Sequence, residues 1–316
     1  MTNEGGPTDA APGATQLANG AVHVADVELS VTHGEAQVGG GIRLHYVEAG
    51  EGPLVVLLHG FPEFWYSWRN QIPALAKAGF HVVAPDMRGY NLSDKPVGWR
   101  QYKADRLAQD IAGLIRHFGV ERAYLAGHDW GAAVAYMTAM RHPELIEKLA
   151  ILNVPHTERM LSGFRTLRQL RKSWYMFFFQ LPWLPEKLAE LDNFSFGKRS
   201  LRSDSPNSFS DADLERYVQA WSQPGALSGA INYYRAALRQ TPRASLAQLV
   251  PIQMPTMVIW GMRDRHLGSE LAEPLPQWVP NLRMERIPEA THWVQHDAPE
   301  RVNALLTEFF GGAQPA

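Results

Sequence analysis

Residues 127–132 read Gly-His-Asp-Trp-Gly-Ala and lie between an apolar run and a helical pattern. Small residues on both sides of a central side chain are typical of the sharp turn that joins a buried strand to a helix and exposes the middle residue. Here that residue is Asp129, where serine is usual. A carboxylate can displace a leaving group from an sp³ carbon and form an alkyl ester. The alternative interpretation is an aspartate that only caps a helix.

Short apolar runs on both sides of this turn predict a mostly parallel sheet. The runs are residues 54–58, 81–84, 123–126, 150–152, 256–260 and 282–287. Helical patterns separate them, and runs of this length fit strands that helices cover on both faces. Ahead of them, residues 22–48 predict two antiparallel strands that turn at glycines 39–41. The fold class is therefore α/β.

A helical insertion interrupts this sheet. Residues 156–249 are aromatic, punctuated by proline and without a strand-like run, so we expect a helical cap there. Ser210 and Asp213 indicate a helix start. An apolar stripe follows at helical spacing, formed by Leu214, Tyr217, Val218 and Trp221. The predicted core is residues 22–155 and 250–316, and its last helix ends at Gly311.

Composition excludes several classes of function. The chain has 316 residues, 45% of them hydrophobic, with a net charge of -2. This balance does not suggest a nucleic-acid partner or an anionic membrane surface. Cysteine is absent, which excludes disulfides, thiolate metal sites and a cysteine nucleophile. No cofactor or metal is expected.

The N-terminal residues do not have the pattern of a signal peptide. Residues 1–19 lack the basic start and apolar run of a signal peptide, and we interpret residues 1–21 as a disordered tail. The most apolar stretch, residues 174–184, is too short to span a membrane, which takes about 20 residues. The expected location is the cytoplasm. The sequence does not set the oligomeric state.

Three further segments complete a candidate hydrolytic site. His59-Gly60-Phe61-Pro62 follows the strand at 54–58, where the backbone N–H groups of Phe61 and Trp130 could hold an oxyanion. Asp264 and His292 follow two late strands, in the nucleophile–acid–base order of the α/β-hydrolase fold. His292 would activate water, and Asp264 would orient its ring.

Other polar residues were weighed as alternatives. Some proteins of this fold place the acid after an earlier strand, but Asn153 stands there and cannot ionise. His292 and His296 are four residues apart and could share a helix face as metal ligands, but no third ligand is evident. We interpret His128 and His266 as structural.

With these residues in place, the chain resembles the soluble type of α/β-hydrolase epoxide hydrolase. The likeness runs from about residue 42 to residue 306. Its signatures are the oxyanion segment at 59–69, the segment at 86–90 and the turn at 127–131. The chain departs from the family at Asn91, where glycine is common.

The resemblance implies an assignment for the cap. Family members use two cap tyrosines to protonate the oxygen of the opened epoxide, and these match Tyr175 and Tyr234 here. Tyrosines that only pack the cap are the alternative, and Tyr233 is expected to face another side of its helix. The implied partners are a small apolar epoxide and water. Candidate pocket residues besides Phe61 and Trp130 are Trp65, Phe177, Phe178 and Trp183.

Two other functions fit part of this pattern. A haloalkane dehalogenase would use the same nucleophile, acid and base, but relatives often place an asparagine where Phe61 stands. Fluoroacetate dehalogenases carry an arginine where Trp130 stands. A non-catalytic binding protein of the same fold would be expected to have lost part of the machinery, and here every element is present.

Overall fold

The computed structural model describes residues 21–24 and 27–311 of the chain. The predicted tail, apart from Ala21, lies outside the described residues. An eight-stranded sheet forms the centre, with strand order β10-β9-β8-β7-β5-β6-β4-β3. Its strands are β3 (Thr32–Gln37), β4 (Arg43–Ala49), β5 (Leu54–Leu58), β6 (His81–Pro85), β7 (Ala123–His128), β8 (Ile146–Leu152), β9 (Thr256–Gly261) and β10 (Leu282–Ile287). The strands from β6 to β10 in this order pair in parallel, and β3 and β4 are antiparallel.

The predicted strands are confirmed with two corrections. Residues 22–48 contain two antiparallel pairs instead of one, because β1 (Ala21–Val24) and β2 (Val27–Ser30) form a separate small sheet before β3 and β4. The turn at Gly39, Gly40 and Gly41 is confirmed, and all three have positive φ angles. Strand β8 begins four residues before the predicted start, since the buried Lys148 interrupts the apolar run and donates to the carbonyl of Phe309 at 2.8 Å.

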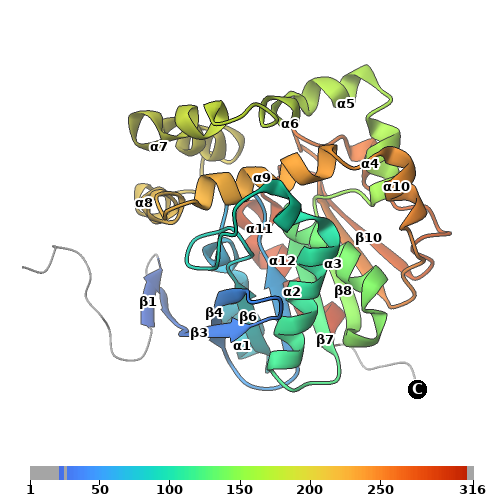
Figure 1. Ribbon diagram of the computed structural model, residues 1–316. Helices are drawn as coiled ribbons and strands as arrows, with labels where there is room; N and C mark the ends of the chain where they lie inside the picture. Colours follow the sequence, from blue (N-terminus) through green and yellow to red (C-terminus); the bar gives the residue numbers. More distant parts are fainter. Residues whose placement is uncertain (1–20, 25–26, 312–316) are drawn as a thin grey trace, which may run out of the picture.

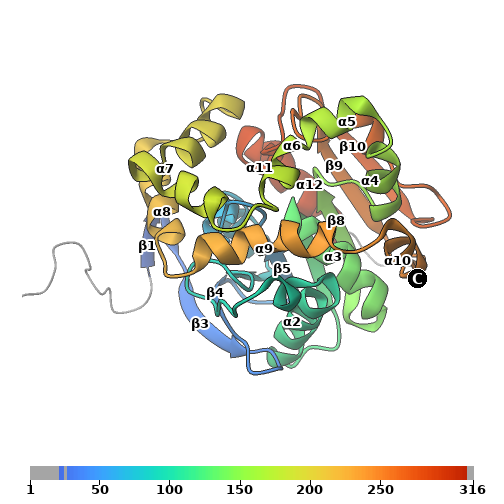
Figure 2. The ribbon, with the colours of Figure 1, turned by 45° about the horizontal axis from the view of Figure 1, so that its top comes forward.

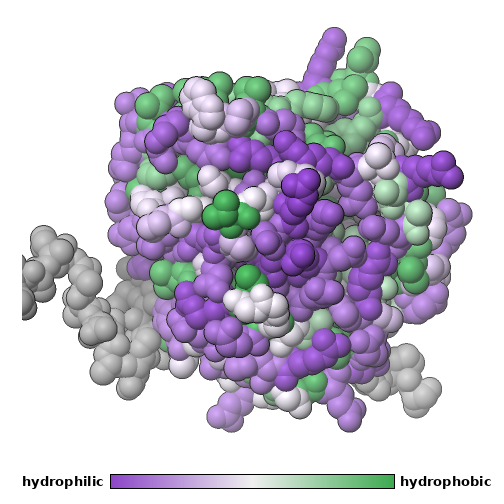
Figure 3. All heavy atoms as spheres, in the orientation of Figure 1, coloured by the Kyte–Doolittle hydropathy of each residue, from purple (hydrophilic) through white to green (hydrophobic). Residues whose placement is uncertain are grey.

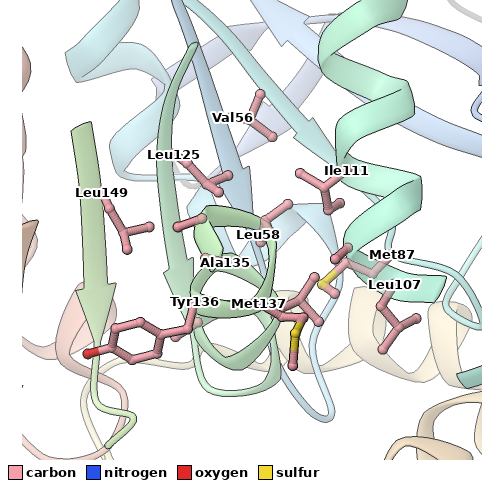
Figure 4. Packing of buried hydrophobic residues seen from close by; sticks show 14 of the residues in the cluster. Val56, Leu58, Met87, Leu107, Ile111, Leu125, Ala135, Tyr136, Met137 and Leu149 are labelled. Carbon is pink, nitrogen blue, oxygen red and sulfur yellow. The ribbon is translucent and has the colours of Figure 1, made fainter. Parts of the chain in front are cut away.

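Helices cover both faces of the sheet (Figure 1). Alternate residues of each strand point to opposite faces, so they divide into two hydrophobic clusters. Val56, Leu58, Leu125 and Leu149 pack against α2 (Ala104–His117) and α3 (Trp130–Arg141), as Figure 4 shows. The opposite face packs against α1 (Gln71–Lys77), α11 (Val294–Asp297) and α12 (Pro299–Gly311). Burial on both faces explains why the central strands read as continuous apolar runs.

Seven helices lie between β8 and β9 and lie over the carboxyl ends of the strands. They are α4 (Thr157–Gly163), α5 (Leu167–Lys172), α6 (Trp174–Phe178), α7 (Leu184–Asp204), α8 (Asp211–Trp221), α9 (Ala226–Leu238) and α10 (Pro242–Ala247). We call them the cap, following the segment proposed from the sequence. Figure 2 shows α5, α6 and α7 in a row on the outer side, beyond α9. No helix in the described part of the chain is long and apolar enough to cross a bilayer.

Local sequence explains the two cap helices nearest the core. Helix α8 begins with the predicted capping box, in which Ser210 and Asp213 bond to each other's backbone N–H groups. Its stripe of Leu214, Tyr217, Val218 and Trp221 is buried, as predicted. Helix α9 buries Tyr233 against the core, and it buries Ile231 and Tyr234 in a separate cluster with Met176 and Phe179 of the cap. The cap is thereby fixed above the strand ends.

Candidate active site

Asp129 stands at the tip of the turn between β7 and α3. Its backbone has φ 49° and ψ -124°, which is unusual for a residue other than glycine and costs about 1–3 kcal/mol. Gly131 is required on the helix side of the turn, because a Cβ there would overlap the carbonyl oxygen of Leu58. The tight contact between the turn and the end of β5 brings Asp129 beside the loop that follows β5.

The loop after β5 contacts the Asp129 carboxylate directly. The backbone N–H of Phe61 donates to Asp129 Oδ1 at 2.7 Å. Gly60 is needed beside it, since a Cβ there would overlap the side chain of Asp129. Trp130 is the first residue of α3, and its N–H is one of those that a helix leaves without an intrahelical partner. One backbone donor is therefore bonded to this carboxylate, and a second N–H without an intrahelical partner belongs to the next residue of the chain.

His292 lies between two carboxylates. Its Nε2 is 3.5 Å from Asp129 Oδ2, and its Nδ1 donates to Asp264 Oδ2 at 2.8 Å. Asp264 follows β9 and His292 follows β10, so neighbouring parallel strands bring the two residues together at one edge of the sheet. The three side chains form a continuous chain from Asp129 through His292 to Asp264, in the order expected from the sequence.

Asn153 binds Asp264, the carboxylate at the other end of this row of three side chains from Asp129. This contact was not predicted from the sequence. Its Nδ2 donates to Asp264 Oδ2 at 2.8 Å, and its Oδ1 accepts from the backbone N–H of Gly261 at 2.8 Å. The other oxygen of Asp264 accepts from the N–H groups of His266 and Leu267. Asp264 thus accepts four hydrogen bonds, counting the one from His292. The sequence placed Asn153 directly after β8, but it did not show that the side chain would contact Asp264, which follows the neighbouring strand β9.

The charges of these groups are set by their neighbours. Burial by itself would lower the pKa of His292, but the charge of Asp264 and the hydrogen bond to Asp129 raise it to about 10. Burial opposes ionisation of Asp264, yet the charge and hydrogen bond of His292 lower its pKa to about 2. The pKa of Asp129 is also lowered, since the His292 contacts outweigh burial. At neutral pH the site holds an imidazolium between two carboxylates.

Two cap tyrosines close the site opposite Asp129. Tyr175 on α6 and Tyr234 on α9 meet edge to face, with ring centroids 5.7 Å apart. Burial raises the pKa of both phenols well above the usual value, and the nearby Asp129 charge adds to the shift. Both therefore remain protonated at neutral pH and keep an O–H to donate. Tyr233 instead donates its O–H to the carbonyl of Arg88 at 2.8 Å.

Aromatic rings surround Tyr234 and form the wall of the site. Phe61, Trp130 and Phe179 lie 5.2, 5.0 and 5.0 Å from its ring centroid. Phe179 was not predicted, although it lies one helical turn after Tyr175 and contacts that ring too. Phe178 packs against the same cluster. The wall is apolar apart from the phenols and one indole N–H.

Three predicted pocket residues lie elsewhere. Trp65 is buried in the hydrophobic cluster on the face of the sheet that α1, α11 and α12 cover. Its ring contacts His33, Phe64 and Tyr66. Phe177 and Trp183 are exposed on the outside of the cap, at 50% and 67% of their surface. Side-chain direction depends on the phase of a helix, and in these cases the sequence did not fix it.

A buried polar network centred on Glu63 lies behind the site. Glu63 accepts from Ser67, Tyr217 and His296 at 2.7 Å each, and its Oε2 is 3.4 Å from Nδ1 of His128. Burial opposes ionisation of Glu63, but the charge of His296 and the hydrogen bonds with His128 and His296 keep its pKa well below the usual value. The network joins the loop after β5, the turn at Asp129 and α11, so three segments that carry the site are tied together.

His296, His128 and His266 have structural partners. His296 bonds Glu63 and Arg69, whereas His292 bonds Asp264, so the two do not share a ligand. His128 bonds the carbonyl of His292 at 2.9 Å, and His266 bonds Asp204 at 2.7 Å. Within residues 21–24 and 27–311, no three His, Asp or Glu side chains are arranged to hold a metal ion.

Comparison with known sequences and structures places the site in context. The α/β hydrolase fold family model matches residues 53–299. The chain is 47% identical over 274 residues to the AB hydrolase superfamily protein YfhM of Bacillus subtilis, covering 85% of this chain and 94% of that protein. It is 41% identical over 282 residues to human epoxide hydrolase 4, covering 85% of this chain and 76% of that protein.

Solved structures agree with these matches. A mutant epoxide hydrolase from Bacillus megaterium, in complex with its product (R)-3-[1]naphthyloxy-propane-1,2-diol, aligns with a TM-score of 0.79 at 34% identity. The alignment covers 88% of this chain and 100% of the other. An epoxide hydrolase from Vigna radiata aligns with a TM-score of 0.79 at 28% identity, over 90% of this chain and 98% of the other.

Proposed function

Because this chain belongs to the epoxide hydrolases of the α/β-hydrolase fold, we propose that it converts an apolar epoxide and water into a vicinal diol through an ester on Asp129. The membership confirms the family and fold predicted from the sequence. The observation that carries the mechanism is the pair of protonated phenols, Tyr175 and Tyr234, beside the ionised Asp129. The charge of Asp129 acts on both phenols, and the apolar rings of Phe61 and Trp130 pack against Tyr234.

The first half-reaction opens the ring. A carboxylate oxygen of Asp129 attacks one epoxide carbon, the C–O bond breaks, and the released oxygen takes a proton from the tyrosine pair. Phenols are suited to this role because they are held neutral by burial and by the Asp129 charge, and an epoxide oxygen needs a donor when it leaves. An alkyl ester of Asp129 results.

The second half-reaction hydrolyses this ester. His292 removes a proton from water, which adds to the ester carbonyl carbon, and the N–H groups of Phe61 and Trp130 stabilise the oxyanion. The C–O bond to the former carboxylate carbon then breaks, and His292 returns its proton to the departing diol oxygen. The original Asp129 oxygen leaves in the diol, and the water oxygen stays in the regenerated carboxyl group. That group gives the second water proton to His292, which restores the carboxylate and the imidazolium.

The charge of His292 couples the two half-reactions. Its pKa is raised partly by Asp129, and esterification neutralises Asp129. The pKa of His292 therefore falls when the ester forms, which releases a proton and yields the neutral base that ester hydrolysis needs. One proton gained by the epoxide oxygen balances one lost from His292. The base is thus available only after the nucleophile has reacted.

The test compares an aryl glycidyl ether with the matched aryl alkyl bromide in single turnovers. The diol bound to the Bacillus megaterium relative is the hydration product of such an ether. With excess enzyme in H₂¹⁸O, we expect unlabelled diol at first turnover and ¹⁸O in the Asp129 carboxylate. Label appearing directly in the diol would rule out the ester. Halide release from the bromide without diol formation would instead assign the site to dehalogenation.

A further inference from the structure

The outer face of the cap concentrates exposed apolar side chains. Eight of the thirteen large hydrophobic residues exposed in the described part of the chain lie within residues 167–196. We call them the cap face: Leu167, Trp174, Phe177, Leu181, Trp183, Leu188, Leu191 and Phe196. They include every exposed tryptophan and phenylalanine among the described residues. Helices α5, α6 and α7, which carry most of them, follow one another in a row along the outside (Figures 1 and 2), and hydrophobic atoms line that edge in Figure 3.

The same segment is basic although the chain is not. Residues 164–204 contain eight Lys and Arg against four Asp and Glu, whereas the whole chain has 30 against 32. The segment therefore carries +4 and the rest of the chain -6. Two of the four acids turn inward, Glu186 to Arg235 and Asp204 to His266. Glu190 and Asp192 remain exposed on this face.

The basic side chains are interleaved with the apolar ones. Arg168, Arg171, Lys187 and Arg199 are exposed on α5 and α7, and Arg165 is exposed just before α5. Arg168 and Lys187 form surface ion pairs with Glu270 and Glu190, and Lys198 and Arg202 are half-buried. Arg165 and Arg171 have no acidic partner within the residues that the structure describes. Exposed ion pairs of this kind are weak and leave the positive field of the face largely intact.

Trp183 shows that the exposure is built into the backbone. It has φ 52°, in the left-handed region that a bulky side chain rarely adopts, and no aromatic ring within the described chain packs on its indole. Strain of this kind marks positions with a role outside simple packing. On α6, Trp174 and Phe177 point outward while Tyr175 points inward to Tyr234 and His266.

We propose that the cap face binds the surface of an anionic lipid bilayer. Tryptophan, phenylalanine and leucine flanked by arginine and lysine are the side chains that insert at the acyl–headgroup boundary and pair with anionic headgroups. A second copy of the chain is the other candidate occupant. A two-fold contact through this face would bring two positive surfaces together, which opposes it. The numbers of acidic and basic residues in the whole sequence are nearly equal, so the net charge does not show the basic excess of residues 164–204.

Membrane binding by the cap face would serve the proposed function, and this step of the argument rests on that function. Apolar epoxides partition into bilayers, and the cap face lies on the opposite side of α6 from Tyr175. Docking would therefore hold the site next to the phase that dissolves its substrate. The binding itself is measured without substrate, so a failure of the proposed reaction leaves this inference standing.

The experiment is flotation of the full chain with vesicles of phosphatidylcholine and phosphatidylglycerol at 7:3, beside pure phosphatidylcholine. We expect binding to the anionic vesicles that weakens as salt rises. In the double variant Leu191→Ser with Phe196→Ser, binding to the anionic vesicles should weaken about tenfold or more for each apolar side chain removed. Arg165→Glu with Arg171→Glu should weaken it at least about 25-fold, at about fivefold for each basic residue lost.

Matched changes elsewhere on the surface provide the controls. Val97→Ser with Leu246→Ser alters exposed apolar residues off the cap face, and Arg106→Glu with Arg243→Glu makes the same charge change. Both should bind as the wild type does, and circular dichroism checks that all variants fold. Equal binding by all variants overturns the proposal. So does a wild type that ignores anionic vesicles but sediments as a dimer dissociated by the Leu191 and Phe196 changes.

Discussion

The sheet and the cap hold their parts of the site by different forces. Asp129, His292 and Asp264 are linked to one another and to Phe61 and Asn153 by hydrogen bonds and ion contacts. Tyr175 and Tyr234 are held mainly by edge-to-face contacts with other rings. The difference follows the chemistry, because the sheet carries charges that must be placed to within a fraction of an ångström. The cap presents neutral donors in an apolar wall.

This comparison assigns distinct half-reactions to the two regions. In the proposed mechanism, groups of the sheet act in both ester formation and ester hydrolysis, whereas the cap phenols act only when the ring opens. Variants that change the rate of ester formation without changing that of ester hydrolysis, or the reverse, therefore test this assignment directly.

The largest effect is expected for Asp129→Ala, which removes the group common to both half-reactions. Loss of a covalent nucleophile typically costs about 10⁴-fold or more in kcat. Intact-protein mass spectrometry should find no adduct with an aryl glycidyl ether. Asp192→Ala, which removes an exposed cap carboxylate, is the control and should react normally. An unchanged initial rate in Asp129→Ala would eliminate this residue as the nucleophile.

His292→Gln should separate the half-reactions. The variant keeps a carboxylate nucleophile but lacks the base, whose contribution is typically about 10²–10⁴-fold. We expect turnover to fall by that factor while the covalent ester accumulates on Asp129, visible as a mass increase equal to the epoxide. Combining the change with Asp129→Ala should abolish the adduct. Fast turnover without any adduct would show that another group activates water.

The double variant Tyr175→Phe with Tyr234→Phe tests the cap alone. Removal of one donor at a developing oxyanion costs about 10²–10³-fold, and a surviving partner softens a single change. The double variant should therefore lose at least this much in the rate of ester formation, with ester hydrolysis and apolar inhibitor binding retained. An alkyl bromide, whose leaving group takes no proton, should be much less affected.

Tyr233→Phe is the matched control for this pair. Tyr233 is adjacent in sequence, but its O–H bonds the Arg88 carbonyl away from the site. It should form the ester at the wild-type rate. Equal epoxide rates for the wild type and the double variant would mean that Tyr175 and Tyr234 only pack the cap.

Asn153→Ala should have a smaller and selective effect. Asn153 donates to the same oxygen of Asp264 that bonds His292, and a hydrogen bond to a charged group contributes about 1.5–3 kcal/mol. Loosening Asp264 should slow ester hydrolysis about tenfold or more while ester formation stays near normal. Asn207→Ala, an exposed amide, is the control. Equal slowing of both steps would assign Asn153 a purely structural role.

The smallest expected effect is a difference in pH dependence. In the resting site the pKa of His292 is raised to about 10 by two carboxylates, so the ring stays protonated below that pH. In the ester only Asp264 remains charged, and the pKa falls. Single-turnover ester hydrolysis should therefore rise with pH about a midpoint below 10, whereas ¹H NMR of the resting imidazole should titrate near 10. Coinciding midpoints would contradict the coupling between Asp129 and His292.

Much of this site was accessible from the sequence because its signals are local. The turn at 127–132 requires small residues in a short span, and the apolar runs at 54–58 and 256–260 required only burial on both faces, whereas the edge strand at 282–287 is only partly buried. Once those strands were placed, their carboxyl ends located Asp129, Asp264 and His292 on one edge of the sheet. The capping box and stripe of α8 were also readable, since a helix start and a 3.6-residue period are properties of neighbouring residues.

Tertiary structure alone decided the features that join distant segments. Asn153 contacts Asp264 across 111 residues, and Glu63 contacts His296 across 233, so neither pair leaves a local pattern. Trp65, Phe177 and Trp183 have the composition of a pocket, yet their direction depended on helix phase and on what covers each face. The net charge of -2 describes the whole chain and does not describe any one surface. Residues 164–204 combine a basic excess with aromatic side chains in the sequence itself, and folding decided which of these side chains are exposed on the outside of the cap.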